Sequence, residues 1–130
     1  MPILTICQRG NVRSVTLAVI LKDFCGLADV APVGIETTTP EGMAGLMNWA
    51  DQAFVAGTVS GAIELHADYP GKVIILDSIG QDVYGKAMHP VLVRKCMEAL
   101  RPLGILNGDH PFYPTEEIYL RAVDAVYGRA

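Results

Sequence analysis

Two residues near the start of the chain could do chemistry, namely Cys7 and Arg13. Ser14 follows Arg13 directly. A cysteine reacts as its thiolate, and its pKa of about 8.5 falls at a helix N-terminus or beside a cation. An arginine presents a planar fork of N–H donors that fits two oxygens of a phosphate group. The spacing therefore predicts a site where Cys7 attacks a phosphate ester while Arg13 binds its oxygens.

The five residues between Cys7 and Arg13 provide backbone amides that can surround a tetrahedral oxyanion. Gly10 allows the backbone to bend so that these amides point inward. The Asn11 side chain can brace the loop from behind, and the Ser14 hydroxyl can donate to the sulfur. We therefore expect the phosphate to be bound by the rest of this loop, namely Gln8, Arg9, Gly10, Asn11, Val12 and Ser14.

A simpler interpretation of Cys7 competes with this one. A cysteine at the end of a buried strand is often only a small apolar core residue. The local context favours the phosphate-binding interpretation, because an apolar stretch over residues 3–6 leads into Cys7 and an amphipathic helical pattern opens near Arg13. Ligands of open α/β sheets bind at the carboxyl ends of strands, beside helix N-termini.

The elements that must position this loop alternate between strand-like and helix-like segments, which predicts a parallel sheet covered by helices on both faces. We expect a three-layer α/β/α domain with a four-stranded parallel sheet in the order 2-1-3-4. Thr39 and Pro40 indicate a helix start as N-cap and first residue, and Trp49 ends that helix on its apolar face, where we expect it in the core. The predicted strands are 2–7, 29–35, 52–56 and 72–76, and the predicted helices are 13–24, 40–49, 58–68, 89–100 and 115–127.

Composition narrows the class of protein. The chain has 130 residues, which fits one domain over 1–130, and 51% of them are hydrophobic. The net charge of −4 argues against general nucleic-acid binding, and no apolar run is long enough for a membrane helix. Three cysteines without framework spacing indicate a reducing cytoplasm. We expect no metal and no cofactor, since no Cys or His pair has ligand spacing.

Several motifs resemble one family. The loop Cys7–Ser14 resembles that of the low-molecular-weight protein tyrosine phosphatases, and above all a shorter branch described as predicted tyrosine phosphatases. Thr39-Pro40-Glu41, Asn48-Trp49-Ala50-Asp51 and Phe54-Val55 resemble the branch's "TPE…WAD…FV" pattern. The segments 72–77, 82–84 and 89–93 resemble its strand, acid loop and last helix start. The resemblance covers roughly residues 2–100, whereas the segment 101–130 has no counterpart.

The resemblance implies a mechanism and its residues. Cys7 forms a phosphocysteine, Arg13 stabilises the transferring phosphoryl group, and an aspartic acid protonates the leaving oxygen and later helps water to hydrolyse the intermediate. The acid is expected at Asp82, in an Asp-Val-Tyr run where the family has Asp-Pro-Tyr, and Asp77 is its competitor. Tyr84 is expected to line the mouth and pack on an aromatic ester. The expected activity is that of a phosphomonoesterase acting on phosphorylated protein or a small aryl phosphate.

The resemblance also has departures that keep two alternatives open. The family's loop asparagine falls where this chain has Gly10, with Asn11 one position later, and Arg9 adds a positive charge inside the loop. One alternative is therefore a catalytically weak or inactive phosphate-binding or phosphoprotein-binding module. The other is an arsenate reductase, which needs two further cysteines able to reach Cys7. Cys25 and Cys96 are the candidates, but their predicted positions favour packing.

Overall fold

The computed structural model describes residues 1–103, so the predicted helix over 115–127 and the rest of the segment 104–130 lie outside the described residues. Four parallel strands form one sheet in the order β2-β1-β3-β4, which confirms the predicted topology. The strands are β1 (Ile3–Cys7), β2 (Val30–Gly34), β3 (Gln52–Val55) and β4 (Val73–Ile75).

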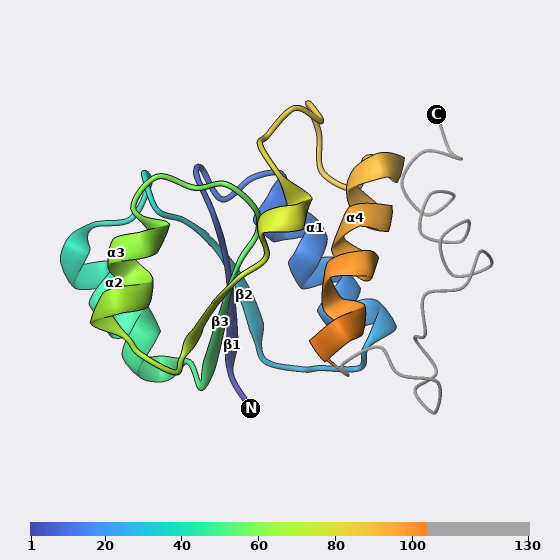
Figure 1. The fold of residues 1–130 in the computed structure, drawn as a ribbon. Helices are drawn as coiled ribbons and strands as arrows, with labels where there is room; N and C mark the ends of the chain where they lie inside the picture. The colour runs from blue at the N-terminus through green and yellow to red at the C-terminus, as the bar shows by residue number, and fades with distance from the viewer. Residues whose placement is uncertain (104–130) are drawn as a thin grey trace.

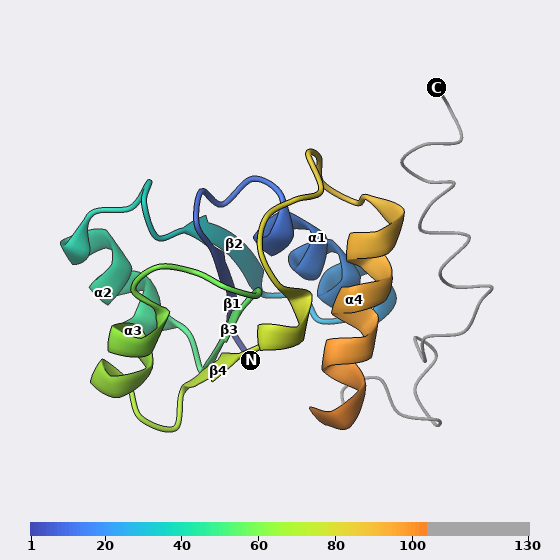
Figure 2. The same cartoon turned by 45° about the horizontal axis from the view of Figure 1, so that its top comes forward.

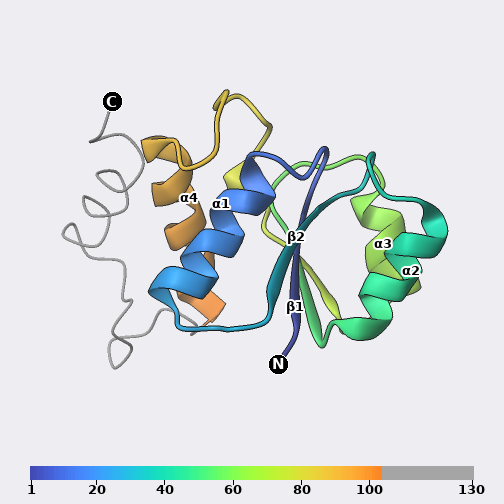
Figure 3. The same ribbon diagram turned by 180° about the vertical axis from the view of Figure 1, so that it is seen from behind.

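Helices cover both faces of this sheet, as the alternating pattern predicts. Figure 1 shows α1 (Arg13–Val19) and α4 (Pro90–Leu100) on one side, and α2 (Pro40–Trp49) and α3 (Ala62–Asp68) on the other; Figure 3 shows the same layers from behind. The result is the expected three-layer α/β/α architecture. No helix within residues 1–103 is long and apolar enough to cross a membrane.

The strands differ in burial according to their place in the sheet. Every residue of the inner strand β1 is buried, in keeping with its apolar sequence. The edge strand β2 alternates, and its Pro32, paired in register with Thr5, is exposed. A proline cannot donate to a ladder, and an edge strand tolerates that loss because one side of it has no partner.

Two helix starts have side-chain caps, and the Thr39 cap of α2 was predicted from the sequence. The Thr39 side chain accepts a hydrogen bond from the Gly42 amide at 3.0 Å, and Pro40 follows as the first residue of α2. His89 caps α4 in a similar way, since its Nδ1 accepts from the Val91 amide at 3.2 Å. The second start matters for function because it fixes the end of the segment that carries Asp82.

The helix predicted over 13–24 spans that range, as an α-helix to Val19 and a π-helix over Ile20–Phe24. Two other predictions about the elements need correction. The helix predicted from residue 58 begins at Ala62, because Gly61 adopts a left-handed φ of 86° directly before it. Trp49 is wrong as a core residue: it is 43% exposed at the last position of α2.

The carboxyl ends of the strands all point to one edge of the sheet, because the strands are parallel. The loops that leave β1, β3 and β4 therefore meet at this edge, where the view of Figure 2 brings them forward. These loops contain Cys7–Ser14, Gly57–Gly61 and the segment between Asp77 and His89. The site predicted from the sequence lies among them.

Candidate active site

The Cys7 thiol lies buried at the carboxyl end of β1, with hydrogen-bonding groups around its sulfur. Sγ is 3.0 Å from the Ser14 Oγ and accepts a hydrogen bond from the Gly10 amide at 3.2 Å. Burial by itself raises the pKa of the Cys7 thiol. The Ser14 hydroxyl and the backbone amides of Ser14, Gly10 and Val12 outweigh burial and lower that pKa below its ordinary value. The loop therefore favours the thiolate, which is the nucleophilic form.

The predicted phosphate-binding loop, Cys7–Ser14, which is called the phosphate loop below, packs backbone against backbone on the end of β2. Gly10 has a left-handed φ of 77°, and a Cβ added there would lie 2.5 Å from the Gly34 amide nitrogen. A Cβ added at Gly34 would lie 2.5 Å from the Arg9 carbonyl oxygen. Two glycines are thus required for this close approach. Gly10 was anticipated from the sequence, whereas the need for Gly34 depends on a contact between distant segments.

Arg13 is buried in the first turn of α1 and is held by one end of its guanidinium. Its Nη1 donates to the carbonyl oxygens of Thr58 and Gly80, both at 2.8 Å. Its Nε is buried and has no hydrogen-bond partner among residues 1–103. An unpaired buried donor of this kind is costly, so the position calls for an acceptor that a bound anion would supply. The two bonds of Nη1 thus fix the guanidinium in place.

Gly57 makes this orientation of Arg13 possible. A Cβ at Gly57 would lie 2.1 Å from the Gly80 carbonyl oxygen and 3.1 Å from the Arg13 Nη1, and Gly57 has a φ of 97°. Any larger residue would displace the carbonyl that holds the guanidinium. Gly57, Thr58 and Gly80 are site residues that the sequence analysis missed. The only feature of the sequence that could have pointed to these three residues is that each lies a few positions after a strand.

A cavity of about 450 Å³ opens over the phosphate loop. Asp82 and Arg13 both line this cavity, although the two residues are far apart in the sequence. Asp77 lies in a 3₁₀ turn, Asp77–Ile79, where it is exposed and outside the cavity lining. The residues that line the cavity are Gln8, Arg9, Asn11, Val12, Arg13, Asp82 and Gly85.

Tyr84 does not face this cavity in the way the sequence suggests. Its hydroxyl donates to the Ile79 carbonyl at 2.7 Å, and its ring lies 5.8 Å from the His89 ring at an angle of 50°. Burial is the main reason that the pKa of Tyr84 is raised, and Cys96 and Asp82 add to it while Arg13 opposes it. Tyr84 therefore supports the shape of the Asp82 segment and is absent from the cavity lining.

The phosphate loop is braced by different side chains from those expected. Asn11 is exposed on the cavity wall, so the expectation that it braces the loop from behind is wrong. Thr5 Oγ1 donates to the Ser14 carbonyl at 2.7 Å, Thr16 Oγ1 donates to the Val12 carbonyl at 2.8 Å, and Gln8 Oε1 accepts from the Ser60 amide at 2.9 Å. Threonines at otherwise apolar positions were the only sequence signal for this network.

The Arg9 side chain and the thiols of Cys25 and Cys96 have surroundings unlike those of Cys7. The Arg9 side chain is 73% exposed, and its Nε lies 3.8 Å from a Glu36 carboxylate oxygen, too far for a strong ion pair. Cys25 and Cys96 are buried, and burial raises the pKa of the Cys25 thiol to about 12 and raises that of Cys96 as well. Within residues 1–103, no group of three His, Cys, Asp or Glu side chains is placed to hold a metal.

Comparisons with known proteins agree with this architecture. No family model matches the sequence, and no curated protein matches it. A solved structure of a YwlE mutant from Bacillus subtilis is similar, with a TM-score of 0.53 and 18% sequence identity, over 82% of this chain and 95% of that chain. The likeness shows that the two chains share a fold. At this identity it establishes the fold and leaves the activity to be argued from the site.

Proposed function

We propose that the protein is a cysteine-dependent phosphomonoesterase that acts on phosphotyrosine in proteins or on small aryl phosphates. The observation that carries this proposal is the unpaired, buried Nε of Arg13, which lies in the same loop as a cysteine whose pKa is lowered. A nucleophile favoured as its anion and an unfilled guanidinium donor are the two parts that phosphoryl transfer requires. The cavity above them is open to a substrate.

The proposed reaction has two steps. The Cys7 thiolate attacks phosphorus, so that an S–P bond forms as the bond to the leaving oxygen breaks. Arg13 and the loop amides stabilise the equatorial oxygens while Asp82 gives its proton to the leaving oxygen. Asp82 then removes a proton from water, which attacks the phosphocysteine and releases inorganic phosphate and the thiolate.

Asp82 is proposed as the acid because it shares the cavity with the loop, whereas Asp77 lies outside that cavity. The two carboxylates form a matched pair, since both are exposed and both follow β4. We expect Asp82→Asn to lower kcat by about 10²-fold or more, as the loss of a general acid does. Asp77→Asn should leave kcat close to that of the wild type.

The test is turnover of phenyl phosphate and of a phosphotyrosine peptide, whose leaving groups both need a proton, by the wild type and these two variants. Hydrolysis by the wild type that is lost in Asp82→Asn and kept in Asp77→Asn supports the proposal. If Asp77→Asn is the damaging change, the acid is assigned wrongly. If the wild type binds inorganic phosphate but hydrolyses neither ester, the proposed activity is wrong and the phosphate-binding module takes its place.

The binding module is the second candidate because of one observation at the loop. Asn11 is exposed on the cavity wall, so the loop is braced by threonines and a glutamine instead. The arsenate reductase alternative is disfavoured by the thiols themselves. Burial raises the pKa of both Cys25 and Cys96, which makes them poor partners for thiol exchange with Cys7.

A further inference from the structure

Thr16 connects the two halves of the candidate site through one hydroxyl group. The residue is fully buried, at 0% exposure, in the middle of α1. Its Oγ1 donates to the Val12 carbonyl of the phosphate loop at 2.8 Å and accepts a hydrogen bond from the Met88 amide at 2.8 Å. Met88 belongs to the segment that runs from β4 to α4. One side chain thus bonds both the loop that holds the phosphate and the segment that carries Asp82.

The second of these bonds is the informative one. A threonine within a helix often donates to the carbonyl four residues before it, which accounts for the bond to Val12 without any functional role. The bond from Met88 has no such local explanation, because it joins positions 72 residues apart. Met88 also has a left-handed φ of 61°, a conformation that is costly for a residue other than glycine and that persists only where its surroundings impose it.

The two ends of the Asp82 segment are held at different places in the site. Arg13 Nη1 binds the Gly80 carbonyl at one end, and Thr16 Oγ1 binds the Met88 amide at the other. Between these anchors, Asp82 is exposed and lines the cavity. The position of an exposed carboxylate on a loop depends on the points that fix the loop. The Arg13 anchor belongs to a residue proposed to bind the phosphate, whereas the Thr16 anchor belongs to a residue that bonds only the backbone of the loop and of the segment.

We propose that Thr16 is a positioning residue, which fixes the Met88 end of the segment 80–88 and so sets Asp82 over the phosphate loop. The proposal rests on the proposed function, since it assigns Thr16 a share in delivering the acid. Thr16 touches neither the substrate nor the reacting atoms. Its loss should therefore impair proton donation to the leaving group more than phosphate binding.

The experiment compares Thr16→Val, which keeps the shape and removes the hydroxyl, with Thr16→Ser, which keeps the hydroxyl. Each is assayed on 4-nitrophenyl phosphate, whose leaving group needs little protonation, and on phenyl phosphate, whose leaving group needs more. For Thr16→Val we expect kcat/KM on phenyl phosphate, which reports the step in which the leaving oxygen is protonated, to fall by about tenfold or more, with a much smaller loss on 4-nitrophenyl phosphate. Thr16→Ser should restore both rates, and inhibition by inorganic phosphate should weaken by less than the rate on phenyl phosphate falls.

Thr5→Val is the matched control, because Thr5 is also fully buried and its hydroxyl also bonds the loop, but it does not touch the Asp82 segment. It should not change the ratio of the two rates. Equal losses of kcat/KM on both esters in Thr16→Val, or the same change of the kcat/KM ratio in Thr5→Val, would show that Thr16 acts only through stability. Either result would overturn the proposal.

Hydrogen exchange of the Met88 amide separates this proposal from the proposed function. Exchange should be faster in Thr16→Val than in the wild type and restored in Thr16→Ser, whether or not the protein turns over. Unchanged exchange in Thr16→Val overturns the anchoring. A wild type that hydrolyses neither ester overturns the proposed function and the role of Thr16 in catalysis. In that case, exchange of the Met88 amide still shows whether Thr16 anchors the segment.

Discussion

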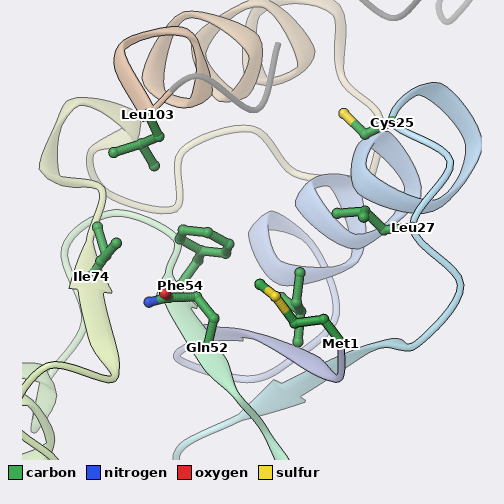
Figure 4. Close-up of a pocket in the computed structure, with 8 residues that line it drawn as sticks. Met1, Cys25, Leu27, Gln52, Phe54, Ile74 and Leu103 are labelled. Carbon is green, nitrogen blue, oxygen red and sulfur yellow. The ribbon is translucent and has the colours of Figure 1, made fainter. Parts of the chain in front are cut away.

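The two ends of the sheet each place a buried cysteine beside a cavity of similar size. At the carboxyl end, Cys7 directly precedes Gln8, which lines the polar cavity of about 450 Å³. At the amino end, Figure 4 shows an apolar pocket of about 420 Å³ with Cys25 in its wall. The lining of this second pocket comprises Met1, Ile3, Cys25, Leu27, Gln52, Phe54, Ile74 and Leu103.

The two thiols differ in what accompanies their burial. Burial acts without opposition on Cys25 and raises its pKa to about 12. Burial also acts on Cys7, but the Ser14 hydroxyl and converging amides outweigh it and lower the pKa. Neither a buried cysteine nor a large cavity therefore identifies a reactive site by itself. The hydrogen-bond donors directed at the sulfur make the difference.

The largest effect that this comparison predicts comes from exchanging each sulfur for oxygen. Cys7→Ser should reduce turnover of 4-nitrophenyl phosphate to background, a loss on the order of 10⁴-fold or more, because an alcohol is a far weaker nucleophile here than a thiolate. Cys25→Ser should lower stability by roughly 1–3 kcal/mol, since it places a hydroxyl in an apolar wall, and leave the kcat of the folded protein unchanged. Steady-state rates and urea denaturation measure both. A Cys25→Ser variant that is folded but inactive would remove the distinction between the two ends.

The next effect concerns Arg13, whose buried Nε has no hydrogen-bond partner among residues 1–103. Arg13→Lys keeps the positive charge but removes Nε and the planar fork, and one ammonium group cannot both replace the bonds to Thr58 and Gly80 and bind two phosphate oxygens. We expect kcat/KM to fall by about 10²-fold or more, in the range found when one transition-state donor is removed. Activity of Arg13→Lys close to that of the wild type would show that charge alone is needed and that the orphan Nε has no role.

A smaller effect tests the hydroxyl that distinguishes Cys7 from Cys25. Ser14→Ala removes the hydrogen bond that lowers the pKa of Cys7 most strongly, so this pKa should rise and the thiolate should appear only at higher pH. Below the wild-type pKa, alkylation of Cys7 by iodoacetamide should slow by about tenfold, equivalent to one hydrogen bond of roughly 1.5 kcal/mol to a charged group. An unchanged pH profile of alkylation would assign the lowered pKa to the amides alone.

Much of the fold could be predicted from the sequence, because its signals are local. The apolar run of β4 and the Thr39-Pro40 start of α2 depend on residues next to one another, and alternating elements allow few topologies. The loop Cys7–Ser14 was predictable for the same reason, since its nucleophile, its bend and its guanidinium are close in sequence.

The parts that could not be predicted depend on contacts between distant segments. Arg13 meets carbonyls 45 and 67 residues away, and Thr16 meets an amide 72 residues away. Nothing near Gly57 in the sequence shows that a Cβ there would collide with the Gly80 carbonyl. Trp49 failed as a core prediction for a related reason, since an apolar residue at the last turn of a helix can lie past the edge of the layer it helps to cover.

The most direct test is alkylation of the wild-type protein by iodoacetamide, followed thiol by thiol with peptide mass spectrometry across pH. We expect Cys7 to react with a midpoint below the ordinary thiol value of about 8.5, and Cys25 and Cys96 not to react in the folded protein. Inorganic phosphate should protect Cys7 competitively. A Cys7 that reacts no faster than the other two cysteines, or that phosphate does not protect, would contradict the proposed site.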